Sequence, residues 1–508
     1  MSAKVNVVSR MGQLKFRVPF RDLLKHKLVL NTGIYTLGAL LQRFGAFLLI
    51  PLYTRYLSPE EYGIAGLVLT AGSVLTAILG LGIYGSVTRY FFDYHGEELK
   101  SYISTTILFY WGFLFIVFVM LTRWGAGLWD FVTSGQIAFY PIVALMLWAV
   151  FGDLLGQVQL SLYQVQQRAA QYILAQWGRF LLITIASIFY IVALQRGAIG
   201  QITGTVIGAL CLGAVLAGIT IKRYWTRKIR FQFIKQNLVY GLPLVPHLAA
   251  QWAKVYVDRF ILERNTTLGD LGLYSLVSTI ALGLVILAQS INQAYAPFYF
   301  DIMSKSDATE LRIVKIIVSI AIILSSITMA GVVFSRQIIF LLAPPDYQNA
   351  AHYLPMVMFG ALLNGFYYLF VNPLFYFKKT NLLPWVTGGS VALGFASNLF
   401  AIPRWRLWGA VGANLFTQSI ILVVIYLASQ KVQRLSFPIK RIMVLVGIVF
   451  SASIYSGWGY LRIDHMIDLF IKLSYLATFG VLAWVLLIRP YFSFRRLVSK
   501  SVEGCGIL

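Results

Sequence analysis

The stretch from Ile313 to Phe334, IVKIIVSIAIILSSITMAGVVF, decides the fold class of this chain of 508 residues. It is 22 residues long with one charged residue, Lys315, so as a helix it would cross the roughly 30 Å apolar core of a bilayer. Hydrophobic residues make up 59% of the chain and charged residues only 12%, whereas soluble domains carry about 25% charged residues. The sequence therefore predicts a polytopic membrane protein.

Similar apolar stretches recur along the whole chain. None alternates with the period of two that is typical of a membrane β-barrel, so the expected fold is all-α. We expect fourteen transmembrane helices, near residues 30–54, 62–88, 103–122, 137–162, 174–195, 199–221, 237–263, 269–298, 313–334, 347–374, 382–402, 408–430, 442–460 and 467–488.

The basic residues predict the orientation of these helices. The chain has 42 Lys and Arg against 18 Asp and Glu. With both termini in the cytoplasm, 30 of the basic residues lie on the inner side, eight lie in outer loops and four lie within helices. Cytoplasmic loops of membrane proteins carry such an excess, so the charge indicates topology and not a nucleic-acid partner.

The first 29 residues lack the apolar core of a signal peptide, so we expect no cleaved leader.

An internal repeat predicts two lobes. Ser58–Thr70, SPEEYGIAGLVLT, aligns at an offset of 209 residues with Thr267–Thr279, TLGDLGLYSLVST. Six helices separate the copies, so the two halves have the same orientation, as in transporters whose repeats are related by an axis along the membrane normal. The expected organisation is a basic cytoplasmic segment at 1–29, an N-lobe at 30–235, a C-lobe at 236–438, two extra helices at 439–490 and a cytoplasmic tail at 491–508.

Several motifs at these positions carry a resemblance to a known family. They are PLYTRYLSPEEYG at 51–63, YGLPLVP at 240–246, Asp258-Arg259, LGLYS at 271–275, NLFAIP at 398–403 and WGAVGA at 408–413. On these residues the chain resembles the oligosaccharide and polysaccharide flippases (Wzx-like) of the multidrug/oligosaccharidyl-lipid/polysaccharide (MOP) exporter superfamily. One departure is Arg404-Trp405-Arg406, where relatives often carry a turn that contains glycine.

The resemblance implies a function and its partners. It implies a flippase in the plasma (bacterial inner) membrane that moves a prenyl-diphosphate-linked oligosaccharide from the inner to the outer leaflet by alternating access, for polysaccharide and cell-envelope glycan synthesis. The expected partners are this lipid, membrane lipids and other polysaccharide-assembly proteins. The chain has no G-x-x-x-x-G-K motif and no metal-ligand spacing, so we expect no ATP, cofactor, metal or catalytic residue.

Two other functions remain open. An ion-coupled multidrug-type exporter of the same superfamily would favour acidic cavity residues and usually has twelve helices. A membrane glycosyltransferase or ligase would need a larger outer segment with paired acids, whereas the outer acids here, Glu263 among them, are expected to be solvated helix caps.

The seventh expected helix carries a polar stripe. His247, Gln251, Lys254 and Asp258 recur at i, i+4, i+7 and i+11 and so share one helix face. Because a charge at mid-bilayer costs about 2.5–3.5 kcal/mol on insertion scales, the stripe should face a polar cavity or a protein seam in which Lys254 pairs with Asp258. The neighbouring Arg259 is either a cavity cation or an interfacial anchor.

Other intramembrane polar residues extend this candidate site. They are Asn31, Gln42 and Arg43 in the first helix and Gln289 and Asn292 in the eighth, whose amides line the cavity or bond neighbouring helices. By the resemblance, Arg43 and Lys254 would hold the diphosphate and the amides would bond sugars or water. Asp153 is expected to pair with Arg179 or to carry a coupling proton. Pro243 and Pro246 predict either a hinge or a static kink.

Overall fold

The structure is a computed structural model that describes residues 38, 45, 47–304, 310–379, 381–459 and 465–492. The expected cytoplasmic segment 1–29 and residues 493–508 of the expected tail lie outside this set. The described chain is helical with no strand, and eleven of its helices are long and apolar enough to cross a membrane. The protein is therefore an all-α, multi-pass membrane protein, as its composition predicts.

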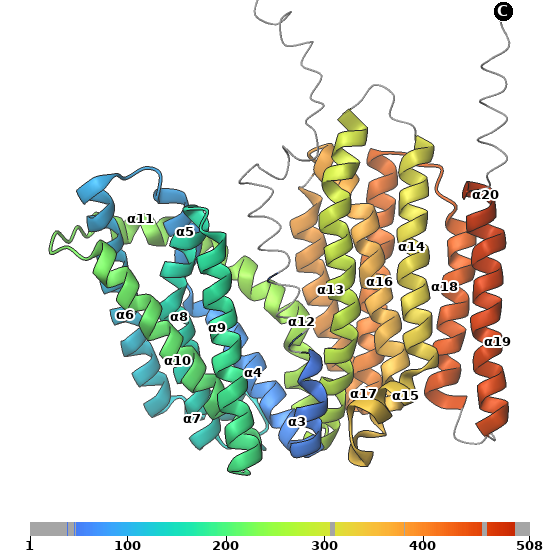
Figure 1. The fold of residues 1–508 in the computed structure, drawn as a ribbon, viewed down its shortest axis with the longest axis horizontal. Coiled ribbons are helices and arrows are strands. Elements are labelled where there is room, and N and C mark those ends of the chain that lie inside the picture. Colours follow the sequence, from blue (N-terminus) through green and yellow to red (C-terminus); the bar gives the residue numbers. More distant parts are fainter. Residues whose placement is uncertain are drawn as a thin grey trace, which may run out of the picture.

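The first half of the described chain forms one group of helices (Figure 1). These are α4 Pro59–Leu79, α5 Ile83–Tyr90, α6 Gly96–Trp124, α7 Ala126–Val132, the π-helix η1 Phe139–Val143, α8 Ala144–Val165, α9 Ala169–Ile188, the π-helix η2 Phe189–Ala193 and α10 Gly197–Tyr224, whereas the short α3 Ile50–Tyr56, which precedes α4, lies at the lower end of the second group. A connecting segment follows, with α11 Gln232–Gly241, the 3₁₀ turn η3 Leu242–Leu244 and α12 Val245–Asn265.

The second half forms the other group of helices. These are α13 Leu268–Ser304, α14 Glu310–Val333, α15 Ser335–Leu342, the 3₁₀ turn η4 Pro345–Tyr347, α16 Ala350–Tyr376, α17 Leu382–Val432, α18 Ile439–Ile454, the π-helix η5 Tyr455–Gly459, α19 His465–Ala483, the π-helix η7 Trp484–Ile488 and α20 Arg489–Phe492. Figure 1 shows α12 crossing the space between the two groups, which we call the N-lobe and the C-lobe.

The spans expected at 382–402 and 408–430 correspond to two helices that meet at Arg406, where the backbone is not helical, and that together carry the label α17. The span expected at 237–263 is divided by η3 into α11 and α12. Most of the span expected at 30–54 lies outside the described residues, although Gly38 and Gly45 lie against Ile173 and Phe180 of α9.

The start of α4 shows how local sequence sets a helix boundary. Ser58 accepts a hydrogen bond from the Glu61 backbone N–H at 3.2 Å, and the Glu61 carboxylate accepts one from the Ser58 N–H at 3.1 Å. This reciprocal capping box satisfies two backbone donors, and Pro59 occupies the first helical position, where its missing N–H costs nothing. The repeat copy is capped in a related way, since Thr267 Oγ1 accepts from the Asp270 N–H at 3.1 Å.

The turn within α17 lies at the departure from the family motif. Arg406 has φ 49° and ψ −126°, a backbone conformation that favours glycine. We expect Arg406→Gly to stabilise the protein by about 1 kcal/mol, because a non-glycine residue in such a conformation costs about 1–3 kcal/mol. A thermal melt of the purified protein in detergent checks this, with Arg404→Gly as the control. If Arg406→Gly lowered the melting temperature as much as Arg404→Gly does, the expected stabilisation would be wrong.

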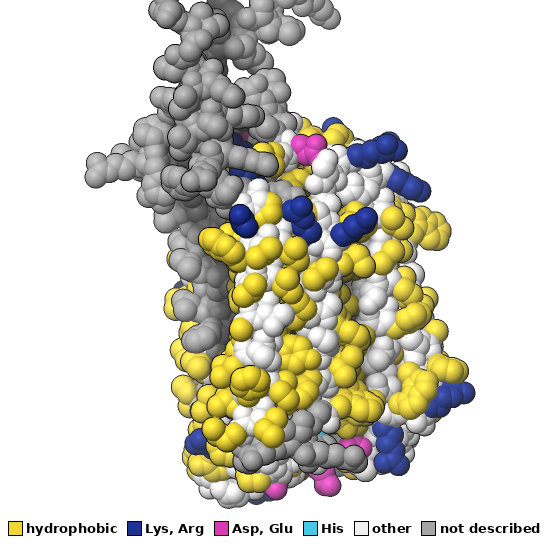
Figure 2. Space-filling view, turned by 90° about the vertical axis from the view of Figure 1, so that its right-hand side faces the viewer, with side chains coloured by type: hydrophobic (Ala, Val, Ile, Leu, Met, Phe, Trp, Pro, Cys, Tyr) yellow, Lys and Arg dark blue, Asp and Glu magenta, His cyan; other side chains and the backbone are white. Residues whose placement is uncertain are grey.

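The surface agrees with the assignment to a membrane. Figure 2 shows hydrophobic side chains over the middle of the visible face, with Lys and Arg gathered near its upper end and side chains of both charges near its lower end. In Figure 1 α11 lies at the upper end and α3 and α7 at the lower end. The segment between α10 and α11, which carries Arg227, Lys228 and Arg230, therefore marks the upper side as the predicted cytoplasmic side.

Candidate functional site

The two lobes meet where the repeated helices α4 and α13 cross. A Cβ atom built on Gly63 would lie 2.4 Å from the Leu268 carbonyl oxygen, and one built on Gly272 would lie 1.8 Å from the Pro59 carbonyl oxygen. Gly63 and Gly272 are equivalent at the repeat offset of 209, and so are Pro59 and Leu268. The contact is thus the same on both sides of a pseudo-twofold axis, and glycine allows the two backbones to approach closely.

Further bonds close the same end of the molecule. The Thr54 hydroxyl of α3 donates to the Leu342 carbonyl of α15 at 2.6 Å, and the Tyr347 hydroxyl donates to the Leu57 carbonyl at 2.9 Å. Both bonds fasten the segment that leads into α4 to the C-lobe, at the end predicted to be outer.

Glu263, near the end of α12, also holds this closed end together. Its carboxylate accepts hydrogen bonds from the backbone N–H and the hydroxyl of Ser134, at 2.8 and 2.6 Å. The side chain is fully buried, so the expectation that Glu263 is a solvated helix cap is wrong. A carboxylate can be buried here because it receives these hydrogen bonds.

A small polar cavity lies beside this closure, between helices of both lobes. Its volume is about 170 Å³, and it is lined by Tyr62, Gly66, Leu69, Thr70, Ser73, Gln201, Tyr256, Arg259, Ser275 and Thr279. The Arg259 guanidinium donates to the Thr70 hydroxyl at 2.7 Å and lies 5.0 Å from the centre of the Tyr256 ring. We call this space the inter-lobe cavity.

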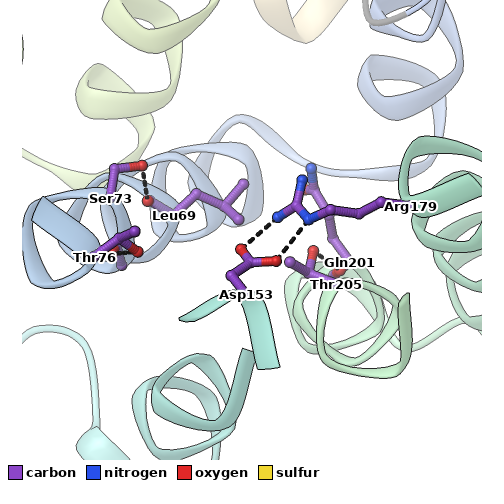
Figure 3. Close-up of polar contacts among 8 residues, drawn as sticks. Leu69, Ser73, Thr76, Asp153, Arg179, Gln201 and Thr205 are labelled. Atoms are coloured by element: carbon purple, nitrogen blue, oxygen red, sulfur yellow. Dashed lines mark hydrogen bonds and ion pairs between the residues drawn. The ribbon is translucent and has the colours of Figure 1, made fainter. Parts of the chain in front are cut away.

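A larger cavity lies within the N-lobe, and one residue of α12 also lines it. Its volume is about 510 Å³, and it is lined by Thr76, Tyr84, Gly152, Asp153, Gly156, Gln157, Leu160, Tyr172, Gln176, Arg179, Ala209, Leu212, Gly213, Leu216 and Trp252. Arg179 donates to both Asp153 oxygens, from Nε at 2.6 Å and from Nη2 at 2.5 Å (Figure 3). The expected pairing of Asp153 with Arg179 is therefore confirmed. We call this space the N-lobe cavity.

One face of α12 borders both cavities. Trp252 lines the N-lobe cavity, and Tyr256 and Arg259 line the inter-lobe cavity. The Trp252 and Tyr256 rings stack with their centres 5.4 Å apart. The three residues recur at i, i+4 and i+7, so they form one stripe along the helix. Trp252 and Arg259 directly follow Gln251 and Asp258 of the expected stripe, so the observed stripe lies on a neighbouring face of the helix.

The structure describes only part of the expected stripe. Asp258 is 9% exposed and accepts a hydrogen bond from the Tyr274 hydroxyl at 2.5 Å, so it joins α12 to α13. His247 lies at the exposed beginning of α12. The side chains of Gln251 and Lys254 lie outside the described set, and so do Asn31, Gln42 and Arg43 of the first expected helix.

The expected amides of α13 bond to a neighbouring helix. Gln289 donates to the Tyr368 hydroxyl at 3.0 Å, and Asn292 accepts from the Asn372 amide at 2.9 Å. Tyr368 and Asn372 both belong to α16, so in this conformation the two amides connect helices of the C-lobe.

The prolines lie at the junction between α11 and α12. Asn237 of α11 accepts from the Tyr102 hydroxyl at 2.7 Å and donates to Thr106 at 2.8 Å, which fastens α11 to α6 of the N-lobe. Pro243 then lies in η3 and Pro246 in the first turn of α12. The chain changes direction between a fastened helix and the helix that crosses between the lobes.

Part of the cavity lining was not foreseen from the sequence, although the repeat contained a signal for it. Thr70 and Thr279 are equivalent at the offset of 209, and so are Gly66 and Ser275, and all four line the inter-lobe cavity. The two repeats cross at a shared axis. Residues at matching positions of the two repeats therefore face the same space. Among the described residues, no group of three His, Cys, Asp or Glu is placed to hold a metal ion.

A comparison with protein families identifies the chain. The model described as "Polysaccharide biosynthesis protein" matches residues 28–303, which is more than half of the sequence. The chain belongs to the polysaccharide biosynthesis protein family.

Two curated proteins of Haemophilus influenzae are similar to this family member. Lsg locus putative protein 1 is 23% identical over 422 residues, covering 80% of this chain and 99% of its own length. An uncharacterized membrane protein is 24% identical over 419 residues, covering 80% and 98%.

Two solved structures of transporters have a fold similar to that of this family member. The lipid II flippase MurJ, in an inward closed conformation, superimposes with a TM-score of 0.70 at 15% identity, covering 90% of this chain and 99% of that one. An inward-facing multidrug resistance MATE transporter of the MOP superfamily has a TM-score of 0.57 at 14% identity, covering 78% and 94%. The resemblance noted in the sequence is thus confirmed at the level of family and fold.

Proposed function

We propose that this protein translocates a prenyl-diphosphate-linked oligosaccharide from the inner to the outer leaflet of the bacterial plasma membrane by alternating access. Its membership of a polysaccharide biosynthesis family supports the substrate class, and its fold supports a transport role. The end that carries the segment between α10 and α11 would be cytoplasmic, since Arg227, Lys228 and Arg230 lie there.

One observation carries the proposal. The lobes are packed through repeat-equivalent glycines at the predicted outer end, a polar cavity lined by helices of both lobes lies beside that contact, and a second cavity lies within the N-lobe next to α12. Each unpaired sugar hydroxyl costs about 2–7 kcal/mol in hydrocarbon, so a glycan can cross only through such a polar space while its prenyl tail stays in the lipid. A contact that is equivalent on both lobes can open when the lobes rock about their shared axis.

In this account cations of the cavity hold the diphosphate. We assign Arg43 and Lys254 to this role, with Arg259 as a third cation that already lines the inter-lobe cavity. Arg43→Ala, Lys254→Ala and Arg259→Ala should each lower transport about tenfold or more, because a hydrogen bond to a charged group contributes about 1.5–3 kcal/mol. Arg43→Lys should retain part of the activity. A complementation assay at matched membrane levels measures this.

The matched control is Arg123→Ala, which removes an exposed cation at the outer end of α6 and should leave transport unchanged. Full activity of all three cavity variants would show that these cations do not bind the substrate.

The function itself is tested by deleting the gene. A lipid-linked oligosaccharide should then accumulate on the inner leaflet, and a plasmid copy of the gene should remove it. If the pool of lipid-linked glycans is the same with and without the gene, the proposed function is wrong. Increased sensitivity to cationic drugs with unchanged glycans would favour the multidrug-type exporter instead.

A further inference from the structure

We infer that the N-lobe cavity is a saccharide-binding subsite, which receives a sugar of the glycan next to the diphosphate. This inference rests on the proposed function and names a place for one part of its substrate. The cavity volume of about 510 Å³ lies within the range of about 300–1,000 Å³ that is typical of small-molecule sites. Its lining combines the three kinds of group that sugars bind: planar charged groups, amides and aromatic rings.

The charged groups are the paired side chains of Asp153 and Arg179. Their side chains remain 25% and 30% exposed, so the pair borders the cavity and is not sealed between its helices. The guanidinium uses Nε and Nη2 in this pair, and its Nη1 donates to no residue of the described chain. A carboxylate accepts and a guanidinium donates, so the two together match neighbouring sugar hydroxyls, which can do both.

An amide oxygen of the cavity lacks a partner. Gln157 Oε1 is buried and accepts no hydrogen bond from any described residue. Gln157 lies on α8 one turn after Asp153, so both side chains lie on the same helix face. Because a buried acceptor without a donor is costly, we expect the Gln157 amide to turn toward a cavity ligand that carries hydroxyl or amide protons.

Aromatic rings complete the lining. Tyr84 and Tyr172 come from α5 and α9, and Trp252 comes from α12. A sugar ring has apolar C–H faces as well as polar edges, so it binds where flat rings lie beside hydrogen-bonding groups. An ion pair that only joined α8 to α9 would need neither the open volume nor Trp252 from a third part of the chain.

Two lipids distinguish binding at the saccharide subsite from binding at the diphosphate site. One is the lipid-linked oligosaccharide extracted from cells that lack the gene, and the other is a prenyl diphosphate of the same chain length without sugar. Both are titrated against the full-length protein in lipid nanodiscs. Gln157→Ala should bind the first lipid about tenfold more weakly, as expected for one lost buried hydrogen bond, and should bind the second as the wild type does.

Two further variants complete the design. Trp252→Phe keeps an aromatic ring of smaller area and should show the same selective loss to a lesser degree, which covers the case in which Gln157→Ala does not fold. The control is Gln348→Ala, an exposed glutamine outside the cavity. Equal affinity changes for both lipids, or none for either, would overturn the subsite. If the wild type binds neither lipid, the proposed function fails instead.

Discussion

Gly272→Val should abolish transport while the protein still inserts into the membrane. A Cβ atom on Gly272 would lie 1.8 Å from the Pro59 carbonyl oxygen, so any side chain there prevents α13 from packing on α4. Overpacking a contact costs about 1–3 kcal/mol, and every 1.4 kcal/mol shifts an equilibrium about tenfold. The closed outer end would become a minor state about tenfold to a hundredfold rarer than in the wild type, and the transport cycle would stall.

The variant should also change the side of the membrane from which a reagent can reach the inter-lobe cavity. We would place a single cysteine at Thr279, which lines the inter-lobe cavity, after replacing the native Cys211 and Cys505. A membrane-impermeant maleimide added from outside should label it faster in Gly272→Val than in the parent.

The matched control for this prediction is Gly283→Val on the same helix, because a Cβ atom there meets nothing within 4 Å. It should leave transport and labelling unchanged. If Gly272→Val transported like Gly283→Val, the α4–α13 crossing would not be the outer gate.

A disulfide across the same contact should stop transport reversibly. A Cβ atom on Gly66 would lie 3.3 Å from the Ser275 Cβ, close to the 3.5–4.5 Å that disulfides require. Gly66→Cys/Ser275→Cys, in a background without Cys211 and Cys505, should therefore form a bond on oxidation that locks the outer end closed. Transport should fall to the level of cells without the protein and return on reduction.

The chain offers a control pair with the same geometry. A Cβ atom on Gly365 lies 3.3 Å from the Ala288 Cβ, but these residues join α16 and α13 within the C-lobe. Gly365→Cys/Ala288→Cys should crosslink without stopping transport, since the lobes can still rock. Full transport by the oxidised Gly66–Ser275 pair would mean that the lobes do not separate at this contact.

Much of the fold could be predicted because its determinants are local. An apolar run such as 313–334 fixes a membrane span whatever surrounds it, and α14 covers Glu310–Val333 accordingly. The repeat of Ser58–Thr70 in Thr267–Thr279 predicted two like lobes, and the crossing at Gly63 and Gly272 follows from it. The break between α11 and α12 was harder to predict, because the apolar sequence continues through Leu242–Leu244 and only the prolines indicate the break.

The site was harder to predict because it depends on which way each helix face turns. The polar stripe of the seventh span was assigned by spacing, yet Asp258 turns to Tyr274 while Trp252, Tyr256 and Arg259 line the cavities. Spacing fixes which residues share a face but not which neighbour that face meets. The prediction that Glu263 is a solvated helix cap was wrong for the same reason, since its partner Ser134 lies far away in the sequence.

Reconstitution shows whether glycan crosses the membrane only when the lobes can separate. The purified Gly66→Cys/Ser275→Cys protein is placed in vesicles with the lipid-linked oligosaccharide extracted from the gene-deletion strain, and the rate at which inner-leaflet glycan becomes accessible to a membrane-impermeant sugar-oxidising reagent is measured. We expect rapid exposure with the reduced protein and, after oxidation, a rate equal to that of vesicles without protein. Glycan exposure that is the same for reduced protein, oxidised protein and empty vesicles would contradict it.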